Sequence, residues 1–427
     1  MYPYQIFDLY KLLRTPRTPP EAIRKIQEKK LKKLVVHAYQ NVPYYRELFD
    51  SIKIKPQDIR KLEDLQMLPF TSKKQIQALS LEEKTAKNIN LKHCKSFITS
   101  GSTGSPLRIF HTFQYETLKN FICARAFLTS GMKPWYKMAA FSGERSVNEK
   151  RPWHEYLMLW RRKEISNWDK PETWIDKLRE WKPQVLTGEI ITLKLLGEAV
   201  QKYQIRDISP KIIFTASIIM DDFSRQYLQS VFCAKIVDIY GSVEGGFIAW
   251  ECEKCSGYHI CSDVVIVEML KNGKPVSPGQ KGEVVITNLH SYAMPFIRYR
   301  QEDIVTLSNK KPVCGRNFPL LEHIEGRTDD FVVLRNGRKI SPHPLYHCID
   351  PVQGVKRWRM VQENINTLKV DIEPAENFTH ESQQRIESNL KKLVGDEIVI
   401  EISLVDSLHV DLSSKFRAVS SKISGNF

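Results

Sequence analysis

A loop rich in hydroxyl groups and glycine is the first candidate for chemistry in this sequence. It reads Thr-Ser-Gly-Ser-Thr-Gly from Thr99 to Gly104, after the apolar pair Phe97-Ile98 and before a strand-like run at 107–110. Small residues let backbone N–H groups approach phosphate oxygens, and the hydroxyls add further donors. No Gly-Lys-Ser/Thr follows the glycines, so the loop is not of the Walker type. Taken alone it also fits an ordinary turn, and its assignment to phosphate binding depends on other motifs.

Cysteine and histidine gather in a second segment. A Cys-x-x-Cys pair, Cys252 and Cys255, is followed by His259 and Cys261, and Cys314 lies further along. A Cys-x-x-Cys turn can place two thiolates on one tetrahedral ion, and a nearby His with a distant Cys completes a closed site. We therefore expect a structural zinc bound by Cys252, Cys255, His259 and Cys314, with Cys261 as the substitute if Cys255 points away. Four protein ligands leave no open position for catalysis, and the alternative is a set of buried or reduced thiols.

The composition favours a protein that attracts anions. Lys and Arg number 64 against 49 Asp and Glu, a net charge of +15, which suits nucleotides, CoA, nucleic acid or acidic lipid as partners. No apolar run approaches the ~20 residues of a membrane span, and the first residues lack the pattern of a secretory signal. Eight scattered cysteines argue against a disulfide framework, and aromatic and basic residues are not interleaved as in single-strand binders. We expect a cytoplasmic protein with reduced thiols, no transmembrane segment and no nucleic-acid partner.

The elements that must position these groups follow from the hydrophobic pattern. Residues up to about 90 read as helices joined by Pro-containing turns, among them an amphipathic helix over 21–40 whose polar face carries much of the positive charge. Strand-like and helical stretches then alternate to about 325, which is typical of α/β proteins. The clearest of these are strands at 211–214, 234–240, 262–270 and 282–288 and a helix at 114–130. Beyond Gly326 a small α+β domain of about 100 residues fits. Its expected elements are strands at 331–334, 356–361, 367–372 and 397–405 and a helix at 381–394.

Four further motifs follow the loop in a fixed order. They are Asp238 to Glu244, Pro295 to Asp303, Gly326 to Asp330 and Ser413 to Arg417. Together with the loop they resemble the adenylate-forming superfamily. The short chain and the early segment 41–49, Asn-Val-Pro-Tyr-Tyr-Arg-Glu-Leu-Phe, look like its phenylacetate–CoA ligase and CapK-like branch. The resemblance covers nearly the whole chain.

The resemblance also implies a fold and a division into domains. Residues 1–326 would form a large N-terminal α/β domain of the acyl-adenylate-forming type, which binds ATP and the acid. A hinge would span 327–330, with Asp329 or Asp330 as the hinge residue. Residues 331–427 would form a small mobile α+β domain that rotates between the two half-reactions.

ATP-binding roles follow from the same resemblance. The loop Thr99 to Gly104 would hold the β- and γ-phosphates, Tyr240 would stack on adenine, and Asp238 would hydrogen-bond near the adenine amino group. Asp303 has the residue type that accepts both ribose hydroxyls, and Arg327 would contact the ribose or phosphate side. The residues implied in ATP or AMP binding are Thr99, Ser100, Gly101, Ser102, Thr103, Gly104, Ser217, Asp238, Ile239, Tyr240, Gly241, Ser242, Asp303 and Arg327.

Two residues are implied in catalysis. Glu244 would ligate Mg²⁺, and Lys415, on the small domain, would reach the α-phosphate and carboxylate oxygens during adenylation. A compact ammonium suits that task, because negative charge builds at phosphorus as the carboxylate attacks and pyrophosphate leaves.

Three departures from the family pattern bear on turnover. Val243 stands where a Thr or Ser hydroxyl is usual, Gln301-Glu302 replaces Thr-Gly, and Ser414 replaces the glycine before the lysine. Ser242 lies one position before Val243, and Glu244, Asp303 and Lys415 are retained. We therefore expect an active enzyme.

The expected function is ATP-dependent activation of a carboxylic acid to an acyl-adenylate, with release of pyrophosphate and transfer to CoA. One alternative is transfer to an amine or sugar in surface-polysaccharide or natural-product assembly, and another is a degenerate zinc-containing binding protein. The expected cofactors are ATP, Mg²⁺, structural Zn²⁺ and CoA. Segments 141–145, 216–217 and 245–247 are expected to line the acid pocket, and the aromatic content hints at an aryl or apolar acid. The sequence leaves open a monomer or a homodimer.

Overall fold

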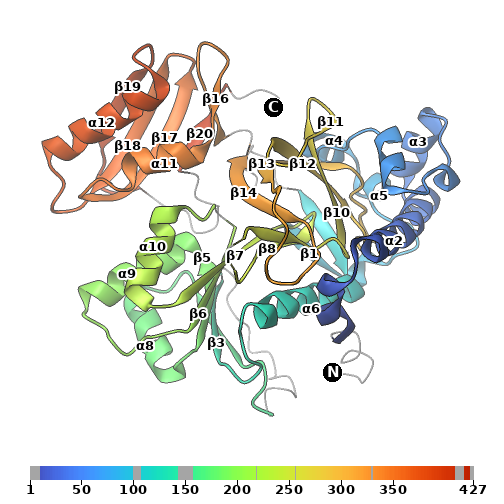
Figure 1. The fold of residues 1–427 in the computed structure, drawn as a ribbon, viewed down its shortest axis with the longest axis horizontal. Coiled ribbons are helices and arrows are strands. Elements are labelled where there is room, and N and C mark those ends of the chain that lie inside the picture. Colours follow the sequence, from blue (N-terminus) through green and yellow to red (C-terminus); the bar gives the residue numbers. More distant parts are fainter. Residues whose placement is uncertain are drawn as a thin grey trace.

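The computed structural model describes residues 10–99, 107–142, 157–217, 219–254, 256–327, 330–408 and 418–423. A 12-stranded mixed sheet forms the centre, and a separate 4-stranded sheet lies near the C-terminus (Figure 1). The strands of the large sheet are, in order across it, β11 (Lys274–Pro275), β10 (Val265–Lys271), β12 (Lys281–Asn288), β13 (Tyr299–Leu307), β14 (Leu320–Arg327), β9 (Tyr258–Ile260), β8 (Gly246–Glu251), β7 (Lys235–Ser242), β6 (Ile212–Ala216), β5 (Val185–Glu189), β3 (Met138–Ser142) and β4 (Arg162–Ser166).

One half of this sheet, from β4 to β7, is parallel and covered on both faces. Successive side chains of a strand point to opposite faces, so neighbours enter different cores. Leu186 and Ile213 pack with the helices on one face, whereas Val185 and Ile212 pack with Phe127 on the other. The helices of the first face are α8 (Pro171–Trp181), α9 (Ile190–Lys202) and α10 (Asp222–Phe232), and Phe127 belongs to α6 (Phe113–Thr129) (Figure 1).

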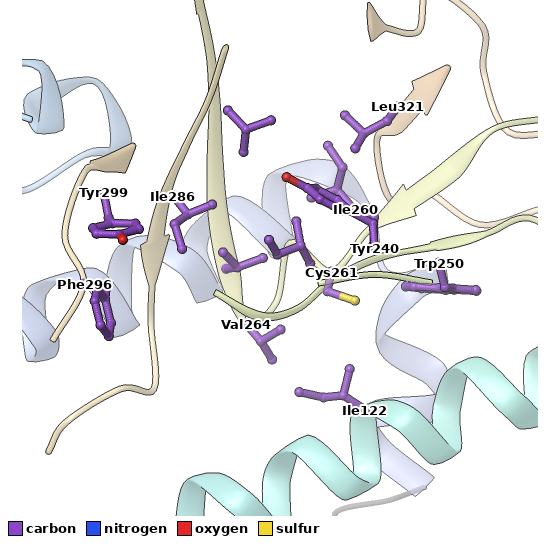
Figure 2. Packing of buried hydrophobic residues seen from close by; sticks show 14 of the residues in the cluster. Ile122, Tyr240, Trp250, Ile260, Cys261, Val264, Ile286, Phe296, Tyr299 and Leu321 are labelled. Carbon is purple, nitrogen blue, oxygen red and sulfur yellow. The ribbon is translucent and has the colours of Figure 1, made fainter. Parts of the chain in front are cut away.

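The other half, from β7 through β8, β9, β14, β13, β12 and β10 to β11, is antiparallel. Its core includes Ile122 of α6, Trp250 of β8 and Ile286 of β12, seen from close by in Figure 2. Because β7 belongs to both halves, residues at its end lie where the parallel strands meet the antiparallel ones.

The N-terminal region is helical, as the sequence predicts. The helix expected over 21–40 is α2 (Pro20–Asn41), which buries Leu31 and Leu34 and ends before Pro43, the first residue of α3. The further helices are α3 (Pro43–Ser51), α4 (Lys73–Ala78) and α5 (Leu81–Lys84), with short 3-10 turns η1 (Thr15–Arg17), η2 (Pro56–Asp58), η3 (Leu62–Met67) and η4 (Leu91–His93). Among the described helices, none combines the length and apolarity that a bilayer crossing requires.

A buried ion pair ties α6 to the connection between β9 and β10. Two guanidinium nitrogens of Arg125 donate to the two carboxylate oxygens of Asp263 over 2.7 and 3.1 Å, and both side chains are almost fully buried. The guanidinium also lies 5.2 Å from the ring centroid of Trp250 and 5.3 Å from that of Phe318. Burial acts against the charge on Arg125, but the neighbouring Asp263 outweighs it and raises the guanidinium pKa.

The C-terminal part has its own sheet and its own core. The sheet order is β19-β18-β17-β20, and the core contains Trp358, Leu368, Ile386 and Leu390. Its elements are β15 (Val332–Val333), β16 (Lys339–Ile340), α11 (Pro342–Ile349), β17 (Val355–Asn364), β18 (Thr367–Pro374), α12 (His380–Val394), β19 (Val399–Leu404) and β20 (Val419–Ser421). The strands and the helix expected after Gly326 are all present, whereas α11 was missed.

A buried carboxylate joins the C-terminal part to the large sheet. Glu325 of β14 accepts hydrogen bonds from Ser341, Lys281 and Thr306 over 3.1, 2.9 and 3.0 Å, and only Ser341 belongs to the C-terminal part. The next residue, Gly326, has φ of +121°, and a Cβ there would lie 3.0 Å from side chains of Ile219 and Pro342. Glycine therefore lets the chain leave β14 close to α11.

Candidate active site and metal centre

The glycine-rich loop rises from a hairpin of β1 (Cys94–Ile98) and β2 (Arg108–Thr112). At its base Thr99 and Leu107 are joined twice, since Thr99 N donates to Leu107 O over 2.9 Å and Leu107 N donates to Thr99 Oγ1 over 3.0 Å. The Thr99 hydroxyl oxygen therefore braces the ends of the loop. Ser100, Gly101, Ser102, Thr103 and Gly104 lie outside the described residues.

The turn from β7 to β8 requires glycine at two positions. A Cβ on Gly241 would lie 2.5 Å from Gly246 O, and Gly246 has φ of +70°, with its missing Cβ 2.3 Å from the Tyr115 hydroxyl. Inside the turn, Gly245 N donates to Ser242 Oγ over 2.8 Å. The turn that carries Glu244 is thus tight and closed by its own hydroxyl.

Three residues from separate motifs meet beside this turn. Tyr240 donates its hydroxyl to Asp303 Oδ2 over 2.6 Å, and Arg327 Nε lies 3.5 Å from Asp303 Oδ1. Asp303 on β13 is directly opposite Arg327 on β14 in the strand register, which explains how they meet. Burial opposes the charge on Arg327, but Asp303, Asp330 and Glu244 together raise its pKa.

Glu244 lies in the same group and is buried, at 8% exposure. Its Oε1 accepts the Tyr299 hydroxyl over 3.1 Å, and its backbone carbonyl accepts Asn288 Nδ2 over 2.8 Å. Burial, and then the neighbouring carboxylate, raise the pKa of Tyr299 well above its ordinary value, so the phenol stays a donor. The second carboxylate oxygen, Oε2, receives no such hydrogen bond from the described part of the protein and is available to a cation.

Asp238 occupies a deeper position on β7. The hydroxyls of Thr215 and Tyr258 donate to its two carboxylate oxygens over 2.8 and 2.9 Å. Burial raises the pKa of Asp238 to about 7, although both hydroxyls act in the opposite direction. Each oxygen thus already has a protein partner, and the contact with adenine stays a prediction. Ile239 is half-buried against the opposite face of the sheet.

The remaining sequence-based candidates are less fully placed. Ser217 follows β6 with φ of +82°, a conformation that costs an L-residue about 1 kcal/mol or more and is often found at functional sites. Asp330 accepts the Arg327 backbone N–H over 3.3 Å, so it braces the predicted hinge. Asp329 and Lys415 lie outside the described residues, and their roles stay predictions.

The departure at Gln301-Glu302 has a structural cost. Glu302 has φ of +63°, in the left-handed region that favours the glycine usual at this place. We expect the free energy of unfolding of Glu302→Gly to be about 1 kcal/mol higher than that of Glu302→Ala. Both variants remove the carboxylate, but only glycine relieves the backbone strain of a positive φ. Urea unfolding of the two variants checks this. Equal stability, or a more stable alanine variant, would mean that the backbone at 302 is not strained.

The metal candidates form a cluster beside Trp250. The ligand atoms of Cys252, His259 and Cys314 all lie within 4.8 Å of one another, and Cys314 Sγ is 3.2 Å from His259 Nε2. Burial lowers the pKa of His259 to about 4, so the imidazole is neutral, the form that binds metal. Two soft thiol ligands and an imidazole fit Zn²⁺. Cys255 lies outside the described residues.

Cys261, the proposed substitute ligand, is not part of that cluster. It is fully buried in the hydrophobic core shown in Figure 2, and Arg125 lies beside it. Burial raises its pKa to about 12, which keeps it a thiol. The structure therefore groups Cys252, His259 and Cys314 and leaves Cys261 apart.

Sequence reasoning missed four residues around Glu244. These are His111, Tyr115, Asn288 and Tyr299. Tyr299 lies inside a motif that the sequence singled out, and Asn288 is a polar residue at the end of a predicted strand, so both left a weak signal. His111 and Tyr115 left none, because their contacts with Val243 and Gly246 of the turn span more than a hundred residues of sequence.

Known proteins resemble this chain over most of its length. The family described as the CapK C-terminal domain matches residues 332–422. The phenylacetate–coenzyme A ligase of Thermus thermophilus is 26% identical over 406 residues, covering 89% of this chain and 86% of the relative. That of Escherichia coli is 25% identical and covers 88% and 89%. These relatives confirm the branch that the motifs indicate.

Solved structures agree on the fold. A 2-hydroxyisobutyryl-CoA ligase in the postadenylation state, in complex with 2-HIB-AMP, superposes with a TM-score of 0.81 at 19% identity, covering 96% of this chain and 92% of that one. The same ligase in its thioesterification state gives 0.66. The expected fold, a large α/β domain of the acyl-adenylate-forming type with a smaller C-terminal domain, is confirmed.

Proposed function

Because the chain is a homologue of the phenylacetate–CoA ligases, we propose that it activates a carboxylic acid with ATP and passes the acyl group to CoA. The observation that carries the proposal is the meeting of Tyr240, Asp303 and Arg327 beside Glu244. These residues come from three motifs far apart in the sequence, and the adenylation chemistry needs them in one place.

In the first half-reaction a carboxylate oxygen of the acid bonds to the α-phosphorus of ATP. The bond from that phosphorus to the bridging oxygen breaks, and pyrophosphate leaves. Asp303 would hold the ribose hydroxyls, and Arg327 would stabilise charge on the phosphate side. Lys415 would neutralise the charge that builds on the α-phosphate.

Glu244 fits the requirements of an Mg²⁺ ligand. Its free Oε2 is a hard oxygen of the kind that this ion prefers, and the buried setting keeps competing groups away. Bound Mg²⁺ supplies neutralisation of phosphate charge. In the second half-reaction the CoA sulfur bonds to the acyl carbon, and the bond from that carbon to the phosphate oxygen breaks. The thiol proton is lost to solvent, and AMP leaves as the small domain turns.

Acid-dependent ATP–pyrophosphate exchange tests this function. The exchange rate is measured with each acid of a panel of aryl, fatty and hydroxy acids and compared with the rate without acid. Lys415→Ala serves as the control that should lose the acid-dependent signal. A product with the mass of an acyl-CoA identifies the acceptor, whereas an amide or ester formed only with an added amine or sugar would replace CoA in the proposal. If folded protein shows no acid-dependent exchange with any acid of the panel, the adenylation function is wrong and a binding role is favoured.

We further propose that Cys252, His259 and Cys314 hold a structural Zn²⁺, with Cys255 as the fourth ligand. The support is the closeness of two thiols and a neutral imidazole in one buried cluster. Such an ion would clamp the end of β8 to β9 and to the connection between β13 and β14. A closed set of four ligands gives it no part in the reaction.

Removing one of the proposed zinc ligands should therefore lower both the zinc content and the stability of the protein. We expect about one zinc per chain by elemental analysis, and Cys314→Ser should lose the ion and melt several degrees lower because the three segments are no longer joined. Cys233→Ser, at an exposed cysteine after α10, is the matched control and should keep both. Chelator-treated wild type that loses its zinc and melts unchanged would contradict a structural role.

A further inference from the structure

Two buried side chains donate hydrogen bonds to the backbone of the turn that carries Glu244. His111 Nε2 donates to the carbonyl of Val243 over 3.1 Å, and Asn288 Nδ2 donates to the carbonyl of Glu244 over 2.8 Å. Both side chains are 1% exposed and come from other elements, the end of β2 and the end of β12. Successive carbonyls of one turn are thus fixed from two sides.

His111 is itself held on every side. Its Nδ1 lies 2.7 Å from Glu116 Oε1, and Lys119 Nζ lies 2.8 Å from the same oxygen. Its ring packs between Phe97 and Tyr115, with ring centroids 4.8 and 4.7 Å away. Burial alone would raise the pKa of Glu116, but the bonds from His111 and Lys119 lower it to about 2.

The geometry fixes what the His111 ring does. The Val243 carbonyl is an acceptor, so Nε2 donates to it, while Nδ1 lies 2.7 Å from Glu116 Oε1 and 3.3 Å from Lys119 Nζ. The His111 ring therefore connects α6, which carries Glu116, to the turn and fixes the position of the Val243 carbonyl.

Asn288 links the same turn to the same helix. Its Nδ2 also lies 2.6 Å from the Tyr115 hydroxyl, and its Oδ1 accepts the His290 backbone N–H over 3.1 Å. The Tyr115 hydroxyl fills the space beside Gly246 where a Cβ would stand. The first turn of α6 thus lies directly against the Glu244 turn through Tyr115, and it is connected to the turn a second time through Glu116 and His111.

We propose that His111 and Asn288 are positioning residues that hold the Glu244 carboxylate where the nucleotide-bound cation needs it. The proposal rests on the function proposed above for Glu244. The Val243 side chain has no polar atom, so the two contacts with successive carbonyls anchor the turn from outside it. Both contacts are made to backbone carbonyls, so their effect on the Glu244 carboxylate would pass through the backbone of 243 and 244.

A pair of matched variants tests the proposal. Glutamine at 111 places its amide nitrogen near the position of Nε2 and keeps a donor for Val243 O, whereas asparagine reaches only toward Nδ1 and keeps the contact with Glu116. We expect His111→Asn to need about tenfold more Mg²⁺ than His111→Gln for half-maximal pyrophosphate exchange, with similar kcat at saturating Mg²⁺ and similar melting temperatures. A role in folding alone would move the melting temperatures and leave the Mg²⁺ requirement equal.

Backbone amide exchange measured by mass spectrometry separates this inference from the proposed function. We expect the peptide containing 241–247 to exchange faster in His111→Asn than in His111→Gln, whether or not an acid substrate has been found. Equal exchange and an equal Mg²⁺ requirement in the two variants would overturn the positioning role. Faster exchange in His111→Asn, with wild-type protein inactive on every acid, would show that His111 holds the turn and would refute the proposed function of Glu244.

Discussion

Replacing Asp303 by asparagine is expected to lower kcat/KM for ATP in pyrophosphate exchange by about 10²-fold or more. The carboxylate receives the Tyr240 hydroxyl at 2.6 Å and lies 3.5 Å from Arg327 Nε. An amide nitrogen in its place would meet donors at one of these contacts and could not accept both ribose hydroxyls. Arg327 would also lose the charge that offsets its burial.

Tyr240→Phe is the matched control for this prediction. It keeps the ring that would stack on adenine and removes only the hydroxyl that reaches Asp303, so a loss of about tenfold or less is expected. Initial rates at varied ATP, with circular dichroism to verify folding, compare the two variants. If Asp303→Asn costs no more than Tyr240→Phe, the aspartate supports the tyrosine and does not bind the nucleotide.

Replacing Asp263 by asparagine should give the largest loss of stability, about 3 to 5 kcal/mol. The change leaves the fully buried Arg125 with its charge uncompensated, since Asp263 is its ion-pair partner. Desolvating an unpaired guanidinium is costly, and the flanking rings of Trp250 and Phe318 repay only part of it. Urea unfolding followed by tryptophan fluorescence measures the difference.

The double variant Arg125→Met/Asp263→Asn distinguishes the effect of an unpaired charge on stability from the effect of altered packing. Once the guanidinium is gone, no charge remains unpaired, and most of the lost stability should return. Additive losses from Arg125→Met and Asp263→Asn would mean that the pair contributes through packing and that its charges are independent.

Some elements of this fold could be located from the sequence, whereas α8, α9, α10 and most strands of the large sheet were not. Alternation of apolar residues located β6, β7, β10 and β12, and a 3.6-residue period located α2, α6 and α12. The helix α11 was missed because Pro342 and Pro344 read as a loop, although both lie in its first turn, where a missing N–H costs nothing.

Site residues that belong to a sequence motif could be predicted, whereas residues that reach the site only through tertiary packing could not. The order of the motifs singled out Tyr240, Asp303 and Arg327, and the structure brings these three together. No local pattern could show that His111 reaches Val243, because that contact depends on how the β1–β2 hairpin and α6 pack against β8. Burial of Asp238 between two hydroxyls is likewise a tertiary property.

The pairing of β13 with β14 also limits how this chain can change over generations. Asp303 faces Arg327 at the open end of that pair, and register shifts follow only at Ile304/Val305 and Thr306/Leu307. Adding or deleting one residue before Ile304 would turn Asp303 to the other face of the sheet. Length changes are therefore confined to the connection after Leu307, which carries Cys314. A lineage that lengthens this connection must keep that thiol within reach of His259 or lose the proposed metal centre.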